Sequence, residues 1–212
     1  MDSIRSASEG CGNNEIHFGR MNLQKISPPT LILILVFGCL GCSAVDEIKT
    51  EPFVDLERFM GEWYVVASIP TFFEKEAYNP KESYRLNDDG TIATTFTFNS
   101  GALNGFQRAF YPTGFVRDTQ SNAIWGMQFV WPIKADFRIV FVDDDYSHTV
   151  IGRQKRDFLW IMARKPNLED SVLEKLIEIS VEQGYSRDDI IFPLHDRIQI
   201  EQSSFLESKK NG

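Results

Sequence analysis

The stretch Gly61-Glu-Trp-Tyr-Val-Val-Ala-Ser-Ile69 carries the clearest strand pattern of this chain. Trp63, Val65, Ala67 and Ile69 alternate with Tyr64, Val66 and Ser68, and a short helical turn is expected just before them, at residues 55–60. Side chains that alternate with a period of two lie on opposite faces of a β-strand. If Trp63 faces the interior of the fold, the same alternation points Val65, Ala67 and Ile69 inward.

The same alternation returns along the chain, most clearly in residues 92–98, 125–131 and 137–141, with turn signals such as Asn104-Gly105 between the runs. We predict eight strands, at about residues 62–70, 81–87, 91–98, 106–116, 123–131, 136–143, 147–153 and 157–164. Short alternating strands separated by turns predict an all-β protein. Eight antiparallel strands closed in up-and-down order form a barrel that holds one small ligand.

A single helix is predicted after the strands. Residues 169–183 carry apolar side chains at helical spacing, acidic residues lie in the first turn, and Gly184 is suited to end the helix. Its apolar face is expected to pack on the outside of the barrel. Residues 199–212 are expected to form a disordered tail.

The N-terminal residues are expected to form a targeting segment. Residues 31–40 (LILILVFGCL) form an apolar run of ten, which suits a secretory signal, whereas a membrane-spanning helix needs roughly 20 residues. We expect Met21 to be the biological start. The run ends in Gly38-Cys39-Leu40-Gly41-Cys42, and a small residue before a Cys resembles a bacterial lipobox. Cys39 or Cys42 is then lipidated; the alternative is an ordinary secretory signal with incidental cysteines.

These observations divide the chain into four parts. Residues 1–42 are an upstream extension plus signal, residues 43–54 a tether, residues 55–198 the barrel with its helix, and residues 199–212 the tail.

Three motifs, in this order, resemble those of the lipocalin family. Gly61-Glu-Trp63-Tyr64 opens the first strand, Asp144-Asp145-Tyr146 lies in the turn between strands six and seven, and Arg164 ends strand eight. Residues 159–166 (LWIMARKP) are most similar to the bacterial outer-membrane lipocalin branch. The resemblance implies structural roles for Gly61, Trp63, Asp145, Tyr146 and Arg164. It also implies lipid storage or transport, a lipid anchor in the outer membrane facing the periplasm, and a possible homodimer.

The first motif also has a direct physical interpretation. Gly61 lets the chain turn into the strand without a Cβ clash, and Trp63 is expected to plug the floor of the barrel. Arg164 is positioned to lay its guanidinium over the indole ring, a cation–π contact of about 0.5–2 kcal/mol.

An apolar, aromatic cavity is expected inside the barrel, formed by inward side chains of strands three, five and six. The candidate ligand-binding residues are Phe96, Phe98, Trp125, Met127, Phe129, Phe137, Ile139 and Phe141. Such a pocket favours acyl chains through burial of apolar surface. The side chains considered for a polar head group at the rim are Arg108, Arg138, Tyr111 and Tyr146. The alternative is that the aromatic side chains fill the barrel as a solid core.

Motifs for catalysis, metal binding and nucleic-acid binding are not found. The chain has 22 basic and 30 acidic residues, a net charge of −8, and no basic stripe, so nucleic acid is not expected as a partner. No Cys follows Cys42, and the two histidines after it, His148 and His195, lie far apart in the sequence; His148 is expected to be structural. The Asp143–Asp145 run lacks the Gly and distal Glu of a calcium loop. No metal or cofactor is predicted.

The leading hypothesis is a membrane-anchored binding protein, not an enzyme, that holds and moves fatty acids, lysophospholipids or related small hydrophobic ligands in the cell envelope. The alternatives are an enzyme of the same fold acting on a lipid or isoprenoid, and a carrier of a tetrapyrrole or carotenoid.

Overall fold

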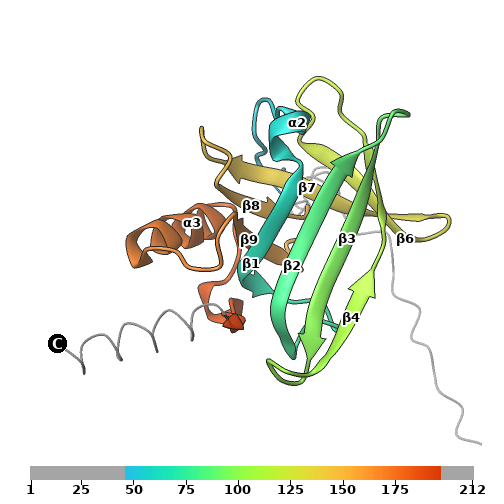
Figure 1. Ribbon diagram of the computed structural model, residues 1–212. Helices are drawn as coiled ribbons and strands as arrows, with labels where there is room; N and C mark the ends of the chain where they lie inside the picture. The colour runs from blue at the N-terminus through green and yellow to red at the C-terminus, as the bar shows by residue number, and fades with distance from the viewer. Residues whose placement is uncertain (1–45, 197–212) are drawn as a thin grey trace, which may run out of the picture. The chain divides into compact units, whose positions relative to one another are not determined.

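A short helix caps one end of the fold. The computed structural model of the chain describes residues 46–196. Helix α2 (Leu56–Phe59) begins after Asp55, whose carboxylate accepts hydrogen bonds from the N–H groups of Glu57 and Arg58. Phe59, the last residue of α2, is buried, and the helix leads into the first strand (Figure 1).

The strands close into one antiparallel barrel. They are β1 (Gly61–Ile69), β2 (Ala77–Leu86), β3 (Thr91–Ser100), β4 (Phe106–Phe110), β5 (Thr113–Val116), β6 (Ile124–Val130), β7 (Ile133–Val142), β8 (His148–Gly152) and β9 (Leu159–Ala163). Each pairs with its neighbour around the ring, and β9 returns to β1. Since β4 and β5 both pair with β3, they occupy one strand position, and the predicted eight-stranded barrel is confirmed.

The division between β4 and β5 falls at Tyr111-Pro112, inside a run predicted as one strand. Proline has no N–H to donate to a neighbouring strand. Its carbonyl oxygen still accepts a hydrogen bond of 3.1 Å from the N–H of Thr94. The strand is therefore interrupted at Tyr111-Pro112 while both halves stay paired with β3.

Two β-bulges change which side chains face inward. The β1–β9 register shifts between Val65 and Ala67, so one extra residue on β1 moves the side chains after it to the opposite face. Ala67 and Ile69 consequently pack in the outer apolar cluster, and the prediction that they face the interior is wrong. A shift between Ile139 and Phe141 in the β7–β8 pair has the same effect on Phe141.

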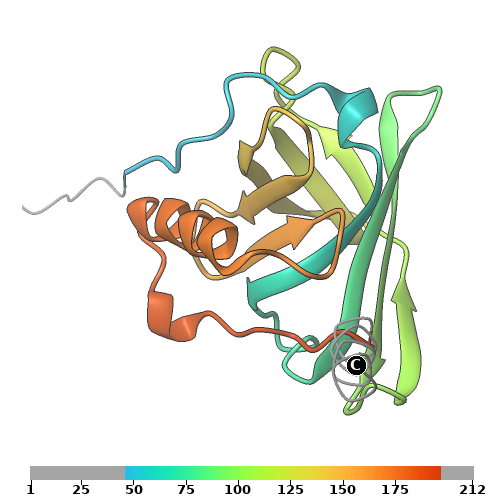
Figure 2. The same cartoon turned by 60° about the vertical axis from the view of Figure 1, so that its left-hand side comes forward.

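Two apolar clusters result, one on each side of the barrel wall. The inner cluster contains Phe59, Trp63, Tyr84 and Trp125 and seals the end of the barrel near α2. The outer cluster joins β8 and β9 to helix α3 (Asp170–Glu182). The predicted C-terminal helix on the outside of the barrel is confirmed, as Figure 2 shows.

The chain after α3 returns to the barrel wall. Gly184, with φ of +91°, follows the last turn of α3, and the short helix η2 (Arg187–Asp189) comes next. Ile191 then forms an antiparallel bridge with Ser68 of β1. The buried His195 lies with Nε2 2.9 Å from the carbonyl oxygen of Val65. The segment therefore extends the sheet at β1, where β2 diverges beyond Tyr64.

Residues 46–54, assigned to the tether from the sequence, instead pack on the barrel. Ile48 and Val54 are buried, and the N–H of Glu51 donates to the carbonyl oxygen of Ile139 at 3.0 Å. The apolar side chains at positions 48 and 54 explain this, because the barrel surface offers them burial.

The targeting segment, Cys39, Cys42 and the predicted tail all lie outside the described residues. Within residues 46–196, no helix has the length and apolar composition to cross a bilayer.

Candidate functional site

A cavity of about 550 Å³ lies inside the barrel, above the inner apolar cluster. This volume is within the range of about 300–1,000 Å³ common for small-molecule sites. Its lining residues come from the β1–β2 loop, from six strands and from two connections at the end opposite α2. They are Thr71, Phe72, Phe73, Glu74, Glu82, Thr94, Phe96, Phe110, Tyr111, Pro112, Met127, Phe129, Val130, Ala135, Asp136, Phe137, Arg153, Phe158 and Trp160.

The floor of the cavity is built around Trp63 and Arg164. The Cζ of Arg164 lies 3.7 Å from the centroid of the Trp63 ring, the stacking expected from the sequence. Trp63 donates from Nε1 to the carbonyl oxygen of Phe59 at 2.9 Å. Gly61 has φ of +96°, and a Cβ there would lie 3.2 Å from Arg164 Nη1. A side chain at position 61 would therefore be strained and would crowd the guanidinium.

Arg164 also ties together the segments around the floor. Its guanidinium donates to the carbonyl oxygens of Arg58, Met60 and Glu62, each at 2.8 Å, and Nε donates to that of Tyr146 at 3.1 Å. The hydroxyl of Tyr146 in turn accepts a hydrogen bond of 2.7 Å from the N–H of Asp55. Four of the five motif residues thus lie at the closed end, whereas Asp145 is an exposed residue of the adjoining turn.

The eight candidate ligand-binding residues fall into four groups. Four of them line the cavity: Phe96, Met127, Phe129 and Phe137. Phe129 lies at the mouth, 58% exposed. Trp125 and Ile139 belong to the inner cluster, and Phe98 is buried against Phe96 and Phe110. Phe141 is outside the barrel because of the bulge described above.

Of the residues considered for a head group, Tyr111 lines the cavity at its mouth. Arg138 forms ion pairs with Glu47 and Asp136, and Tyr146 lies at the opposite, closed end. Arg108 has its Cζ 5.9 Å from the ring of Phe106 on the same strand, and it is exposed.

The sequence interpretation missed the polar groups of the cavity. Glu82 is buried, and burial raises its pKa to about 7; a hydrogen bond from the Tyr84 hydroxyl opposes this rise and the nearby Glu74 adds to it. Burial also raises the pKa of Glu74, whose carboxylate accepts hydrogen bonds from the Thr71 N–H at 2.7 Å and from Trp160 Nε1 at 3.4 Å. The alternation of Glu82, Tyr84 and Leu86 on β2 was the signal that could have revealed the inward carboxyl.

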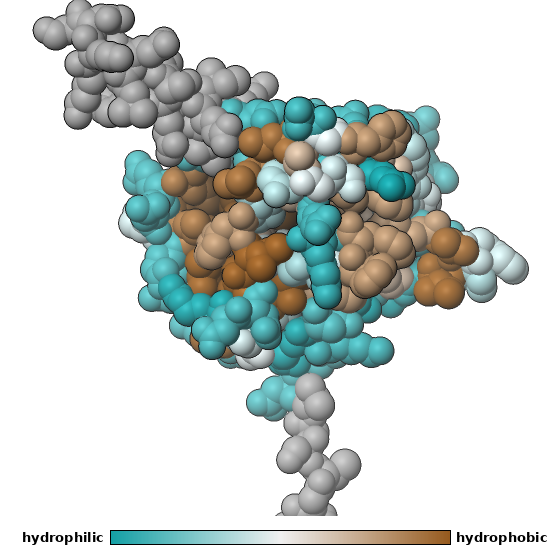
Figure 3. Space-filling model, turned by 90° about the horizontal axis from the view of Figure 1, so that it is seen from below, coloured by the Kyte–Doolittle hydropathy of each residue, from teal (hydrophilic) through white to brown (hydrophobic). Residues whose placement is uncertain are grey.

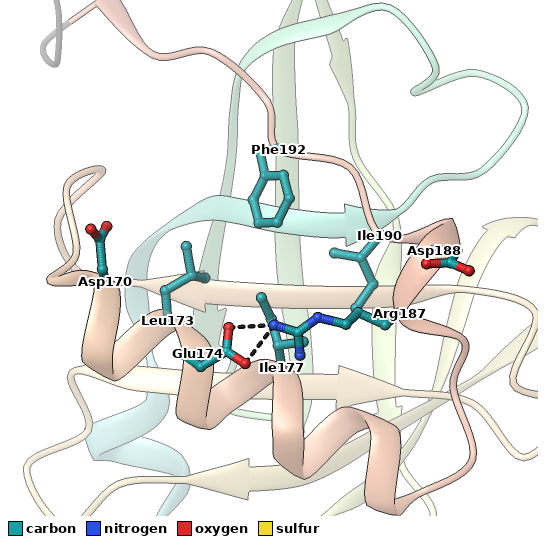
Figure 4. Close-up of a pocket in the computed structure, with 8 residues that line it drawn as sticks. All are labelled: Asp170, Leu173, Glu174, Ile177, Arg187, Asp188, Ile190 and Phe192. Carbon is teal, nitrogen blue, oxygen red and sulfur yellow. Dashed lines mark hydrogen bonds and ion pairs between the residues drawn. The ribbon is translucent and has the colours of Figure 1, made fainter.

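A second depression, of about 510 Å³, lies between α3 and the segment around η2 (Figure 4). Half of its lining residues are charged, and the ion pair of Arg187 with Glu174 crosses it. An apolar ligand would have to displace this ion pair, so the interior cavity is the better candidate site.

Among residues 46–196 no cluster of three or more His, Cys, Asp or Glu side chains is arranged to hold a metal.

A sealed antiparallel barrel around an apolar cavity defines a class of proteins that bind small hydrophobic ligands. Residues 54–195 match the family model of the lipocalin-like domain, and the chain belongs to this family. Members of the family are generally binding or transport proteins.

The relatives include plant and bacterial lipocalins. Temperature-induced lipocalin-1 of Arabidopsis thaliana is 31% identical over 66% of this chain and 78% of its own length. The outer membrane lipoprotein Blc of Vibrio cholerae is 26% identical over 76% of this chain and 94% of its own. Blc of Escherichia coli K12 is 25% identical over 78% of this chain and 93% of its own length.

Solved structures agree on the fold. Insecticyanin of the tobacco hornworm Manduca sexta superposes with a TM-score of 0.55 at 15% identity, over 70% of this chain and 84% of that one. The cockroach allergen Per a 4 superposes with a TM-score of 0.54 at 17% identity, over 70% of this chain and 92% of that one.

Proposed function

We propose that this chain is a membrane-anchored carrier that binds fatty acids, lysophospholipids or related amphiphiles in the barrel without transforming them. The apolar cavity of about 550 Å³, sealed at one end by Trp63 and bounded by aromatic side chains, is the observation that carries this proposal. Burial of an acyl chain there contributes roughly 25 cal/mol per Å² of apolar surface removed from water.

The open end of the barrel supports action at a membrane. We define the rim patch as the exposed Phe72, Phe73, Tyr111, Val130, Trp131 and Ile133. Hydrophobic side chains gather on the face opposite α2 (Figure 3). Exposed apolar patches of this kind mark protein or membrane contacts. A ligand leaving the cavity at this face would pass directly into the lipid.

The anchor is proposed at Cys39 or Cys42, in the outer membrane. The support is the lipobox-like sequence and the similarity to relatives that are outer membrane lipoproteins. Two acyl signals give stable attachment, whereas one chain binds only reversibly. Intact-mass analysis of the mature N-terminus tests this point, and a mature chain that begins at Ser43 would exclude it.

Native mass spectrometry of the detergent-extracted protein tests ligand binding. We expect adducts of copurified lipid, displacement of a fluorescent fatty acid from the cavity, and recovery of the added lipid with unchanged mass. Lack of both adduct and displacement would contradict the proposal, and altered lipid mass would indicate an enzyme. The same spectra report whether the chain is a monomer or a homodimer, and a visible absorption band would indicate a pigment carrier instead.

A further inference from the structure

Two polar side chains interrupt the apolar interior just above the floor of the barrel. Glu82 of β2 pairs with Phe96 of β3, and Thr94 pairs with Tyr84, so Glu82 and Thr94 are diagonal neighbours on the inward face. Both are buried and both line the cavity. Neither side chain is needed to seal the floor, which the aromatic rings of the inner cluster already do.

The Thr94 hydroxyl has no hydrogen-bond partner among residues 46–196. Thr94 is only 3% exposed, so solvent at the protein surface does not reach its hydroxyl. Buried polar groups in folded proteins nearly always have a partner, and an unpaired one needs a specific explanation. Because this hydroxyl borders the ligand cavity, a polar atom of the ligand is the partner that its position suggests.

The spacing of the two side chains suits a single bridging atom. Diagonal neighbours on paired antiparallel strands lie about 7–8 Å apart, with their Cβ atoms somewhat closer. One oxygen that makes two hydrogen bonds of about 2.7–2.8 Å joins side-chain oxygens up to roughly 5.5 Å apart. Because Glu82 and Thr94 both line the same cavity and the longer Glu82 side chain spans part of the gap, a ligand oxygen between them is placed to contact both.

The hydrogen-bonding capacity of the pair selects the chemistry of that oxygen. The Tyr84 hydroxyl donates to Glu82, and the Glu82 carboxyl can accept a further hydrogen bond. A ligand hydroxyl has one donor for Glu82 and a lone pair that accepts from Thr94, so both groups are satisfied without burying a charge. A ligand carboxylate or ammonium would instead bring a charge into this apolar interior, which costs far more than burying a neutral hydroxyl.

We propose that the ligand carries a hydroxyl group on the end that reaches the floor of the barrel, and that this hydroxyl bridges Glu82 and Thr94. The class of ligand is a hydroxylated long-chain lipid whose other end lies at the rim. This inference rests on the proposed function and sharpens it, because a plain acyl chain would place its methyl end against two polar side chains and leave Thr94 unpaired.

Two matched pairs of acids test the inference on the purified full-length protein. Isothermal titration calorimetry compares dodecanoate with 12-hydroxydodecanoate, and hexadecanoate with 16-hydroxyhexadecanoate. In an apolar pocket a terminal hydroxyl weakens binding, because it is buried without a partner. Here we expect it to tighten binding by about three- to tenfold in at least one pair, the gain of one or two neutral hydrogen bonds.

Substitutions identify the partners of the hydroxyl. Thr94→Val keeps the shape of the side chain and removes an unpaired hydroxyl, so the variant is expected to fold at least as stably as the parent protein. It should lose the gain from the terminal hydroxyl, and Glu82→Ala should lose it too. Glu82→Gln should retain the gain because its amide oxygen still accepts. The control Thr95→Val, on the outward face of the same strand, should retain it as well.

The outcomes separate the two proposals. Tight binding of the plain acids with no gain from the hydroxyl in either pair, or an equal gain in Thr94→Val, would overturn the inference and leave the proposed function standing. If the unsubstituted protein binds none of the four acids, the inference fails together with the proposed binding of fatty acids.

Discussion

The guanidinium of Arg164 lies over the indole ring of Trp63, with its Cζ 3.7 Å from the ring centroid, and also donates to backbone carbonyls of the segment that enters β1. One side chain from the last strand thereby joins the first strand to the short helix before it. Because this contact closes the barrel between its first and last strands, it supports the sealed end on which the cavity rests.

Substitution of the floor residue should destabilise the barrel. Trp63 is fully buried, and Trp63→Ala is expected to lower the free energy of unfolding by about 3–5 kcal/mol, since the large cavity it leaves cannot collapse completely. Urea denaturation followed by circular dichroism measures the change. Trp131→Ala is the matched control, because Trp131 is 82% exposed and should change stability little. Equal effects of the two substitutions would refute the floor assignment.

The shape of the Arg164 side chain should matter as well as its charge. Arg164→Lys keeps the positive charge but loses the planar guanidinium that contacts several carbonyl oxygens. We therefore expect the free energy of unfolding to fall by about 2 kcal/mol. The exposed Arg85 provides the control substitution Arg85→Lys. Thermal unfolding of both variants decides the point, and an unchanged midpoint for Arg164→Lys would show that charge alone suffices.

Glu82 should make the stability depend on pH. Burial raises its pKa from 4.5 to about 7 in the folded protein, so the folded state keeps a proton that the unfolded chain releases between these values. The contribution of this group to the free energy of unfolding should therefore fall by about 3 kcal/mol as the pH rises from about 4.5 to about 7. Above that pH it should level off.

Glu82→Gln removes the titrating group and should flatten this part of the pH profile, with the variant more stable than the parent protein at pH 8. The control is Glu57→Gln, at an exposed carboxyl of α2. Denaturation curves at a series of pH values give the comparison. Parallel profiles for the parent protein and Glu82→Gln would mean that Glu82 titrates normally.

Narrowing the cavity should abolish ligand binding without unfolding the barrel. Ala135 lines the cavity, and Ala135→Phe places a ring in the space for the ligand. We expect the affinity for hexadecanoate to fall at least tenfold, measured by displacement of a fluorescent fatty acid. Ala109→Phe makes the same change at an exposed position of β4 and should bind normally. Normal binding by both variants would place the ligand elsewhere.

The rim patch should contribute to membrane binding. We expect the double substitution Phe72→Ser and Trp131→Ser to reduce cosedimentation of the protein with phospholipid vesicles, because both side chains are more than two-thirds exposed and apolar. Phe192→Ser changes an exposed phenylalanine on the segment after η2 and is the control. Similar vesicle binding by all the proteins would exclude a role for the patch.

Most of the barrel could be predicted from the sequence because each strand is a local pattern. The run predicted at residues 62–70 is β1 at Gly61–Ile69, and the helix predicted at residues 169–183 is α3 at Asp170–Glu182. The division of the fourth strand at Pro112 is also readable in the sequence, since proline cannot donate to a sheet.

The orientation of several side chains could not be predicted. Ala67, Ile69 and Phe141 alternate regularly in sequence, but each follows a bulge that depends on the register with a neighbouring strand. Tyr111 and Arg138 are equally suitable head-group residues by composition, yet only Tyr111 lines the cavity. These differences arise from pairing between residues far apart in the chain. The alternation within a single strand gives no information about that pairing.

The sequence by itself determined the antiparallel strands and the outer helix, because alternation and turn residues are properties of short segments. The contact of Trp63 with Arg164 was expected from the order of the lipocalin-like motifs. Only the tertiary structure decided which aromatic residues line the cavity and which fill the floor, and it alone brought Glu82 and Thr94 together on the inward face. The physical reason is that the sheet closes through long-range pairing, and a single bulge reverses the direction of the side chains that follow it in the same strand.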